Sequence, residues 1–314
     1  MYYLGLDIGG TKCAVLAADA AGRILHREVY ATQPPMQMLP QLFQTAKGWN
    51  LPFEVAGISC GGPLSEKEGV ILSPPNLPGW DAVEIVAAIQ NAFGIPAYLC
   101  NDANAGALAE WKFGAGRGVK HLAFLTFGTG LGAGLILNGR LYAGKSGNAG
   151  ELGHWRMMPF GAAGYGKNGS LEGFCSGGGL AQLAKTEALA ALQRAEVPAY
   201  CKSAKDLDTV TAKTVAEAAF HGDPTAREVY RLCGEMLGAS LALLLDLLDL
   251  EKVVIGGIFP RAQALLCPAM EAKLQTECLP QVLRGCEMVP AQLGEQIGDF
   301  AAITVAMLGK EGLL

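Results

Sequence analysis

Clusters of basic residues are missing from this chain of 314 residues. Lys and Arg number 24 against 29 Asp and Glu, the formal net charge is −5, and only 17% of the residues are charged. Binding to the phosphates of a nucleic acid depends on clustered Lys and Arg, so this composition argues against a nucleic-acid partner.

The chain also has little that would place it in or across a membrane. Its first residues, MYYLGLDIGG, have neither the charged start nor the long apolar core of a secretion signal. The most apolar long stretch, ASLALLLDLLDL at 239–250, contains Asp246 and Asp249 and is too short to span a bilayer. It is predicted to be a buried helix.

Paired cysteine spacings are absent as well. The nine cysteines are an odd number and none is spaced C-x-x-C, which fits neither a disulfide framework nor a zinc ribbon. We therefore expect a reduced, soluble protein of the cytoplasm.

Apolar residues and glycines, in contrast, are plentiful. With 51% apolar residues over 314 positions, the chain exceeds what one hydrophobic core usually fills, so two domains are expected. The predicted division is a smaller N-terminal α/β domain over 1–118, closed by the C-terminal helix at 299–314, and a larger α/β domain over 119–298. The 42 glycines lie inside motifs instead of a low-complexity linker.

Each half opens with glycine-turned antiparallel strands and continues with helices, as in a duplicated α/β unit. Strands are predicted at 2–9, 11–19, 21–31, 55–60, 69–73, 96–100, 121–128, 132–144, 252–257 and 286–292. Helices are predicted at 81–93, at 103–113, over much of the chain after Leu180, and at 298–309. Asp81 and Glu84 have the spacing of a capping box, and Gly94 is the expected stop of that helix.

GRLYAGKS, residues 139–146, matches the pattern of a phosphate-binding P-loop, G-x-x-x-x-G-K-[ST]. A P-loop lies between a buried strand and a helix that begins at the Lys-Ser pair. Here Asn138-Gly139 is typical of a two-residue hairpin turn, and Gly147 and Gly150 disfavour a helix directly after Ser146. We interpret the match as a hairpin, so a phosphate site must lie elsewhere.

Two other glycine turns follow strands, one at the head of each half. LGLDIGGTK at 4–12 leads through Asp7 to Gly9-Gly10, and LTFGTGLGAGL at 125–135 repeats the design. Paired glycines permit a positive φ and a close approach to a ligand, and their amides suit an anion. Each turn alone is also compatible with a plain hairpin. Together with the glycines of IGG at 255–257, they predict a nucleotide held between two domains, and the absence of G-x-G-x-x-G disfavours a dinucleotide fold.

DIGGTK, NDANAGALAE, the segment from Phe127 to His154 and VVIGG together resemble the ROK family of sugar kinases, over nearly the whole chain. The resemblance implies the actin-like ATPase fold, a duplicated ribonuclease H-like α/β architecture with two domains around a cleft. It also implies that ATP is held by Asp7, Gly9, Gly10, Thr11, Lys12, Gly128, Thr129, Gly130, Gly132, Gly256 and Gly257. A third glycine that is usual at the last of these sites is Ile258 here.

The sugar-binding residues are predicted partly from the chemistry of phosphoryl transfer and partly from the same resemblance. A sugar hydroxyl needs a carboxylate to accept its proton during phosphoryl transfer, and Asp102 lies at a predicted strand-to-helix corner. The alternative for Asp102 is a helix cap, which Asn101 could also supply. The resemblance assigns Asp102 as general base and implies further sugar contacts at Asn76, Asn101, Glu151, His154 and Glu172. Lone Glu and His residues are usually ordinary surface groups, and Asn76 is also compatible with a turn.

The resulting expectation is an ATP-dependent kinase that phosphorylates a hexose or N-acylhexosamine at the 6-hydroxyl. Mg²⁺ would enter with ATP, with Asp7 as an outer-shell partner, and the resemblance implies a homodimer. ROK proteins also include sugar-responsive repressors with a DNA-binding segment before the first glycine turn, for which Asp7 leaves no room. A chaperone-like or cytoskeletal ATPase would not explain Asn101-Asp102 together with ELGH at 151–154.

No structural zinc is expected, although many ROK kinases bind one. In those proteins a histidine of the GH motif joins three cysteines of a C-x-C-G-x-x-G-C run. In this chain the run is AGYGKNGS at 163–170, so the three thiolate positions are Ala163, Tyr165 and Ser170. His154 alone cannot hold the metal. Packing must order residues 160–171 instead, with Tyr165 expected where the metal would lie.

Overall fold

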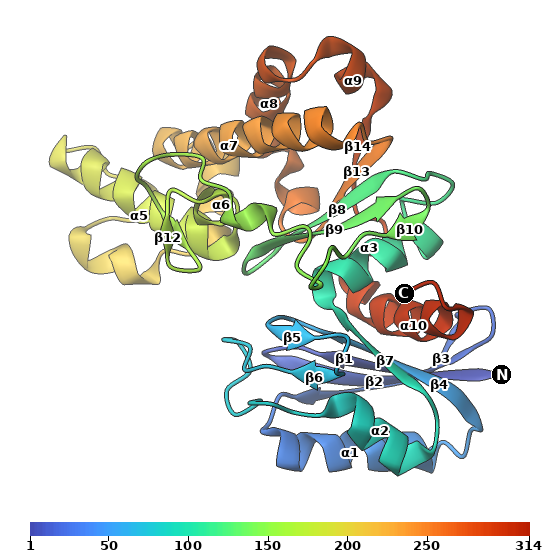
Figure 1. The fold of residues 1–314 in the computed structure, drawn as a ribbon. Coiled ribbons are helices and arrows are strands. Elements are labelled where there is room, and N and C mark those ends of the chain that lie inside the picture. Colours follow the sequence, from blue (N-terminus) through green and yellow to red (C-terminus); the bar gives the residue numbers. More distant parts are fainter. The chain divides into compact units, whose positions relative to one another are not determined.

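A computed structural model describes every residue from Met1 to Leu314. The chain divides into two compact units. The first comprises Met1–Phe124, Gly134–Ala149 and Gln292–Leu314, and the second comprises Leu125–Ala133 and Gly150–Ala291. Both contain strands and helices (Figure 1), which confirms the α/β class. The domain ranges expected from the sequence stay a prediction.

The first unit is built on a five-stranded sheet with the strand order β3-β2-β1-β4-β7. Strand β2 pairs antiparallel with β1 and β3, whereas β1, β4 and β7 run parallel. The strands are β1 (Tyr2–Ile8), β2 (Lys12–Asp19), β3 (Ile24–Ala31), β4 (Phe53–Cys60) and β7 (Ala97–Asn101). The three antiparallel strands predicted at the start of the chain are thus confirmed.

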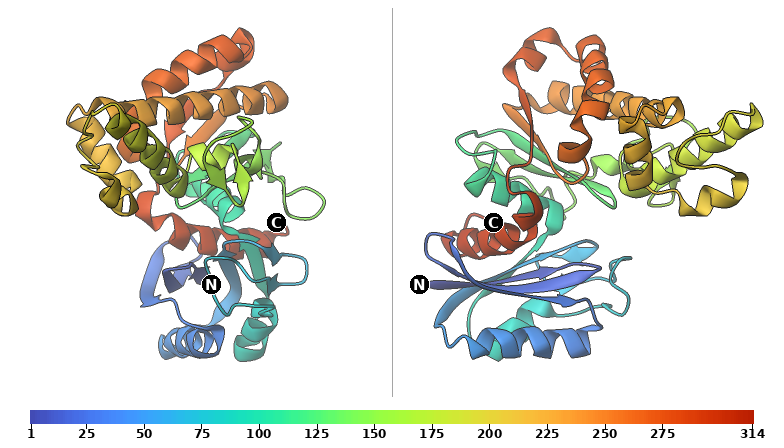
Figure 2. Two further views of the ribbon diagram at one scale, coloured as in Figure 1. Left: turned by 90° about the vertical axis from the view of Figure 1, so that its left-hand side faces the viewer. Right: turned by 180° about the vertical axis from the view of Figure 1, so that it is seen from behind.

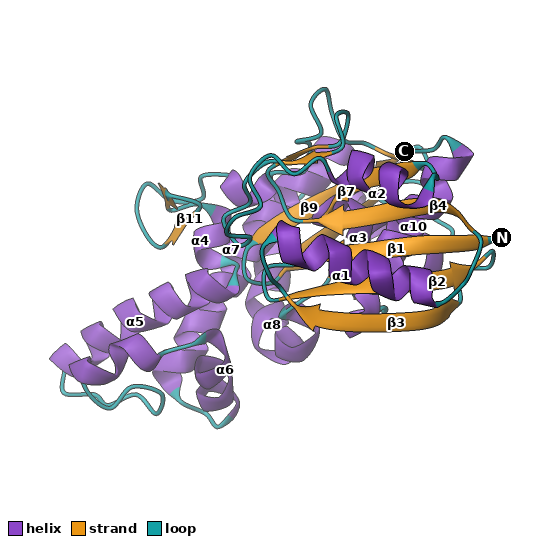
Figure 3. Cartoon of the chain, turned by 90° about the horizontal axis from the view of Figure 1, so that it is seen from below, coloured by secondary structure: helices purple, strands orange, loops and turns teal.

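Helices cover both faces of this sheet. Leu4 and Leu6 of β1 belong to a core shared with α1 and α2, whereas Tyr3 belongs to a separate core shared with α10. Successive residues of a strand point to opposite faces, so one short strand contributes to both cores. Figures 2 and 3 show α1 and α10 on opposite faces of the sheet. The helices of this unit are α1 (Pro35–Gly48), α2 (Ile85–Phe93), α3 (Asp102–Phe113) and α10 (Ile297–Glu311).

Helix α2 begins later than the predicted start at Asp81. Val83 forms a bridge with Ile71 of the small hairpin ahead of the helix, and the helix begins only at Ile85. Sheet pairing before the first turn therefore overrides the capping-box spacing, although Gly94 ends the helix in the left-handed conformation as predicted. The small hairpin consists of β5 (Leu64–Ser65) and β6 (Val70–Ile71).

The second sheet has the strand order β10-β9-β8-β13-β14. Its strands β8 and β9 pass through the boundary between the two units, and β13 and β14 are parallel. The strands are β8 (Leu122–Phe127), β9 (Leu131–Leu137), β10 (Arg140–Leu141), β13 (Lys252–Ile255) and β14 (Glu287–Pro290).

The rest of the second unit is mainly helical, as predicted. Its helices are α4 (Leu171–Phe174), α5 (Gly177–Gln193), α6 (Ala212–Phe220), α7 (Pro224–Leu248), α8 (Phe259–Glu277) and α9 (Pro280–Gly285). A two-stranded ribbon of β11 (Ala163–Gly164) and β12 (Lys167–Asn168) precedes α4. Short 3-10 helices lie at Leu152–His154 and Ala204–Thr209 in this unit, and a third lies at Gly294–Gln296 in the first unit.

The apolar stretch at 239–250 forms most of the last part of α7. Leu241 and Leu245 are buried, but Leu243 and Leu247 are 57% and 72% exposed. The predicted helix is therefore confirmed, whereas its complete burial is wrong, because only one face packs against the neighbouring helices. No helix of the chain is long and apolar enough to cross a membrane.

The segment that matches the P-loop pattern is a hairpin. Asn138 and Gly139 have φ angles of 55° and 70°, and they connect β9 to β10 through an antiparallel register that pairs Leu137 with Arg140. No helix begins at Lys145. The interpretation of this motif as a turn is confirmed.

Candidate functional site

The parallel strands of the first unit end at one edge of their sheet. The register aligns their last residues, Ile8, Cys60 and Asn101. The segments that follow them, Gly9-Gly10, Gly61-Gly62 and Asp102, consequently lie close together at the carboxyl edge, where binding sites of α/β folds are found. The register therefore unites Asp102 with the first glycine turn, two features that are 92 positions apart in the sequence.

The first glycine turn is tight, although neither of its glycines adopts the left-handed backbone conformation. Neither Gly9 nor Gly10 has a positive φ, so the conformational reason predicted for these glycines is wrong. Close packing explains them instead: a Cβ atom added at Gly10 would lie 2.5 Å from the backbone oxygen of Asn76. The Gly9 amide donates to the Lys12 carbonyl at 3.0 Å. The turn thus brings Asn76 directly against Gly10.

Asp7 precedes this turn and lies among other acidic groups. Burial raises the pKa of Asp7 to about 6, and the nearby carboxylates of Asp299 and Asp102 add to the rise. Lys12 and Arg27 act in the opposite direction but are outweighed. The carboxyl of Asp7 rests against the first turn of α10, where a Cβ added at Gly298 would lie 2.2 Å from Oδ2 of Asp7.

A half-buried ion pair that the sequence analysis missed lies beside Asp7. The side chain of Asp299 is 4% exposed, and its Oδ2 accepts a hydrogen bond from Nε of Arg27 at 2.6 Å. The two residues are 272 positions apart. No local pattern could have paired them, because the contact depends on α10 packing back onto the sheet that contains β3.

Asp102 stands at the first position of α3. The cap of this helix is Asn101, whose Oδ1 accepts the amide of Ala103 at 3.0 Å. Oδ1 of Asp102 accepts the same amide at 2.9 Å, which leaves Oδ2 next to Gly61, where an added Cβ would lie 3.7 Å away. The side chain is exposed, yet desolvation by the surrounding protein raises its pKa against the effect of the backbone hydrogen bonds.

Glu66 and the pair Gly61-Gly62 also belong to this edge and were not predicted. Oε1 of Glu66 accepts the backbone amide of Asn101 at 2.9 Å, so it supports the residue before Asp102. A Cβ at Gly62 would lie 3.4 Å from Nδ2 of Asn101. The pair Gly61-Gly62 directly after a buried strand could have been recognised in the sequence as part of a site, whereas no local pattern indicated Glu66.

The second glycine turn, in the second unit, has different supports. The Gly128 amide donates to the Gly130 carbonyl at 3.0 Å, and the Gly177 amide donates to the Gly128 carbonyl at 2.8 Å. Gly177 begins α5, a helix of 17 residues whose cap is Ser176. The N-terminus of a long helix therefore lies against the turn, with amides that suit an anion. The run SGGG at 176–179 was the signal that the sequence analysis did not use.

The third glycine site is joined to the end of β8. The amides of Gly256 and Ile258 donate to the carbonyls of Leu125 and Phe127 at 2.8 and 2.6 Å. Gly257 has a φ of 69°, and a Cβ there would lie 2.0 Å from the Phe127 oxygen, so only glycine fits. Ile258 has a φ of −75°, and its backbone consequently does not require the glycine that is usual at this position.

The predicted sugar contacts of the second unit lie on two adjoining segments. Glu151 precedes the 3-10 turn Leu152–His154, His154 is the last residue of that turn, and both side chains are exposed. Glu172 is on α4, and its Oε2 accepts the amide of Leu131 at 3.0 Å. The second unit thus unites Glu172 with the second glycine turn, just as the first unit unites Asp102 with the first.

The sequence pattern of the ROK family matches residues 3–307. The chain belongs to the ROK family. It is 32% identical over 308 residues to a glucokinase of Streptomyces coelicolor, with 96% of each chain covered. The structure of a ROK family glucokinase from Streptomyces griseus, in complex with glucose and AMPPNP, is 32% identical, superimposes with a TM-score of 0.76 and covers 98% of this chain and 99% of that one. The Escherichia coli regulator NagC is 29% identical over 97% of this chain and 76% of its own.

The loop that carries the zinc cysteines in many ROK kinases is held here by hydrogen bonds. Tyr165 is at the tip of the β11–β12 ribbon and is 74% exposed, so the expectation that it fills the metal position is wrong. Oγ of Ser170 accepts the Gly164 amide at 3.1 Å, and Nζ of Lys167 donates to the His154 carbonyl at 2.5 Å. No three His, Cys, Asp or Glu side chains are grouped so as to hold a metal ion. The absence of bound zinc stays a prediction.

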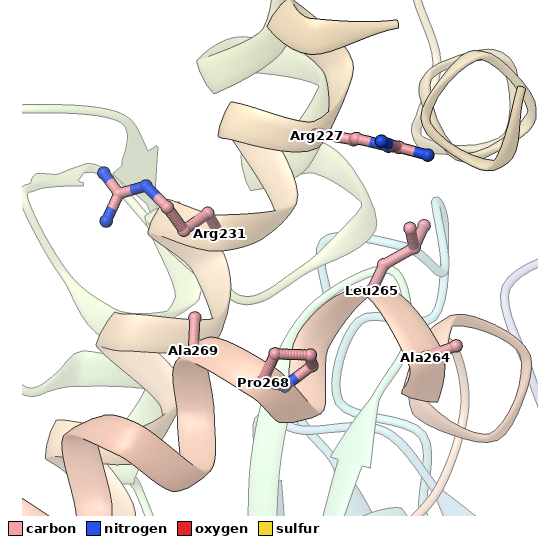
Figure 4. A pocket seen from close by; sticks show the side chains of 6 residues that line it. All are labelled: Arg227, Arg231, Ala264, Leu265, Pro268 and Ala269. Atoms are coloured by element: carbon pink, nitrogen blue, oxygen red, sulfur yellow. The ribbon is translucent and has the colours of Figure 1, made fainter. Parts of the chain in front are cut away.

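A cavity of about 300 Å³ lies apart from the glycine turns of this ROK chain, on α7 and α8 (Figure 4). Its lining residues are Arg227, Arg231, Ala264, Leu265, Pro268 and Ala269. Arg231 is already paired with Glu228 and Glu235 at 2.6 and 2.5 Å, and in Figure 4 it points away from the other lining residues. The cavity therefore has no convergent polar groups and is not a candidate active site.

Proposed function

We propose that this protein is an ATP-dependent sugar kinase that transfers the γ-phosphoryl group to the 6-hydroxyl of a hexose or N-acylhexosamine. The observation that carries the proposal is the position of Asp102, at the carboxyl edge of the first sheet beside the turn Gly9-Gly10. The glucokinases among its relatives support the phosphorylation of a sugar.

Asp102 is proposed as the general base. Its Oδ1 is engaged by the Ala103 amide, so Oδ2 is the oxygen that accepts the proton of the sugar hydroxyl as the phosphoryl group arrives. Because desolvation raises its pKa, the carboxylate is a better proton acceptor than an Asp in water. Asn101 and Glu66 keep the start of α3 in place for this step.

The phosphates of ATP are proposed to lie at the two glycine turns, with further amides supplied by the start of α5. Backbone amides and a helix N-terminus compensate negative charge without losing their orientation during the reaction. Mg²⁺ that accompanies ATP neutralises further phosphate charge. The acidic surroundings of Asp7 fit a water-mediated contact with a divalent cation, and the turn at Gly256-Gly257 is proposed to flank the adenosine.

The sugar is proposed to contact Asn76, Asn101, Glu151, His154 and Glu172. Exposed carboxylate, amide and imidazole groups provide both donors and acceptors for sugar hydroxyls. The backbone of Asn76 lies directly against Gly10, so a sugar bound to this residue would lie next to the first glycine turn.

The test is a coupled kinase assay over a panel of hexoses and N-acylhexosamines, repeated with Asp102→Asn. The variant should keep its fold and its sugar affinity while kcat falls ~10²-fold or more, because the amide cannot accept the proton. Turnover close to that of the wild type would exclude Asp102 as the base. Product analysis by NMR decides whether the phosphate is on the 6-oxygen.

A sugar-responsive regulator is the second candidate, and the similarity to NagC favours it. A regulator needs to bind sugar but does not need phosphoryl transfer. Sugar binding in calorimetry without product formation, over the whole panel and with ATP and Mg²⁺ present, would support the regulator over the kinase.

A further inference from the structure

Glu172 is enclosed by three glycines from three segments of the second unit. An added Cβ at Gly130 of the second glycine turn would lie 2.7 Å from Oε2 of Glu172, and one at Gly164 of β11 would lie 2.6 Å from its Cβ. One at Gly153, within ELGH, would lie 3.5 Å from its Cβ. A side chain larger than hydrogen at Gly130 or Gly164 would displace this carboxylate. The packing therefore fixes where the side chain of Glu172 points.

The two oxygens of this carboxylate have different surroundings. Oε2 accepts the amide of Leu131, the residue that follows the turn and begins β9. No protein group donates to Oε1. The helix that carries Glu172 is itself fixed, because Ser170 caps α4 through the amide of Gly173 and also binds the Gly164 amide. The hydrogen bond to Leu131 thus joins a fixed helix to the glycine turn.

We propose that Glu172 is a positioning residue for the second glycine turn: Oε2 holds the Leu131 amide, while Oε1 is left for a sugar hydroxyl. This inference rests on the proposed function, and it adds that a single side chain on the sugar side sets the affinity for nucleotide even when no sugar is present. A hydrogen bond to a carboxylate is stronger than one between neutral groups. Its loss leaves the turn with only its backbone contacts to Gly177 and within itself.

The experiment measures binding of AMPPNP with Mg²⁺ to the full chain by calorimetry, in the absence of sugar. Glu172→Ala should bind the analogue about tenfold more weakly, which is the effect of losing one charge-assisted hydrogen bond. Glu172→Gln should bind the analogue less tightly than the wild type but more tightly than Glu172→Ala, because its amide oxygen still accepts the same N–H group through a weaker, neutral hydrogen bond. A general loss of structure around α4 would not be rescued in this way.

His154→Ala is the matched control. His154 is also a proposed sugar contact, but it makes no hydrogen bond to the turn. The His154→Ala variant should bind AMPPNP like the wild type. The KM for sugar should rise both in His154→Ala and in Glu172→Ala. Glu172→Asp, whose carboxylate is one methylene further from Leu131, replaces Glu172→Ala if circular dichroism shows that the alanine variant is unfolded, and the same loss is expected.

The outcomes separate this inference from the function on which it rests. If the wild type does not bind AMPPNP, the proposed function fails. If the wild type binds it and the folded alanine or aspartate variant binds it equally well, the positioning role is overturned and the kinase assignment is untouched. A glutamine variant as weak as the alanine variant would also overturn it, because charge and not the hydrogen bond to Leu131 would then be responsible.

Discussion

The two glycine turns follow a strand in the same way but are supported differently. In the first unit, Asp7 lies two residues before Gly9 and supplies a carboxylate from the turn's own strand. In the second unit the corresponding position is Thr126, and the carboxylate comes from Glu172 on a separate helix. Similar turn sequences therefore do not imply similar supports, because what surrounds each turn depends on the elements packed against it.

The two carboxylates also differ in how well their charge is compensated. Oε2 of Glu172 accepts a backbone amide, whereas burial and two neighbouring carboxylates raise the pKa of Asp7 to about 6. The first turn thus holds a charge that is unfavourable in the free protein. Binding groups are often strained in this way when a ligand supplies the missing partner.

Asp7→Asn should remove the uncompensated charge that distinguishes the first turn from the second. Of the changes considered, it should have the largest effect on stability and activity. The pKa of Asp7 is about 6 in the folded protein, whereas its ordinary value is 3.8. The folded protein therefore binds this proton more tightly than the unfolded chain does. The stability that this carboxyl contributes is complete below pH ~4 and is lost as the pH rises through about 6. The variant should therefore be more stable than the wild type by roughly 3 kcal/mol at pH 7.5, and kinase activity should be lost.

Thermal unfolding at pH 7.5, 6 and 4.5 measures this prediction, and the advantage of the variant should shrink as the pH falls. Asp208→Asn is the control, since the side chain of Asp208 is fully exposed and its replacement should give no pH-dependent gain. Equal midpoints for wild type and Asp7→Asn at pH 7.5 would contradict the account of the first turn.

Gly10→Ala and Gly128→Ala test whether the two glycine turns differ in how closely the protein packs around them. The new Cβ at Gly10 would lie 2.5 Å from the Asn76 backbone, whereas at Gly128 the nearest atom is Oγ1 of Thr126 at 4.0 Å. Gly10→Ala should destabilise the protein by about 1 to 3 kcal/mol, and Gly128→Ala should stay within about 0.5 kcal/mol of the wild type. Comparable losses in the two variants, measured by thermal or denaturant unfolding, would show that close packing does not distinguish the turns.

Removal of metal tests the prediction that the loop beside Glu172 binds no zinc. Protein purified without added metal should contain no stoichiometric zinc by elemental analysis, and activity after chelation should return with Mg²⁺ alone. The reason is that Ala163, Tyr165 and Ser170 stand where thiolates would be needed. Activity that returns only with zinc would refute the prediction.

Lys145→Ala should have the smallest effect. Lys145 is exposed and follows the β9–β10 hairpin, so affinity for AMPPNP should be unchanged. Lys12→Ala is the matched change at the first glycine turn and should weaken binding. A loss of nucleotide affinity confined to Lys145→Ala would mean that GRLYAGKS binds phosphate after all.

Much of the local structure was predictable from short patterns. The hairpin at Asn138-Gly139, the stop of α2 at Gly94 and the cap of α3 at Asn101 each depend on neighbouring residues. Backbone preferences and side-chain caps act over a few positions, so they can be recognised in short stretches of the sequence. The alternation of apolar residues predicted the strands for the same reason, and the motifs were sufficient to indicate the ROK family.

The sequence alone therefore determined the elements, the turns and the family. Only the tertiary structure decided that α2 begins at Ile85, that Tyr165 is exposed, that Arg27 pairs with Asp299 and that Glu172 holds Leu131. Each of these depends on residues that are far apart in the chain or on competition between a helix and a sheet bridge. Such contacts form because whole elements bury apolar faces against one another, and that packing, not any local preference, determines which polar groups meet.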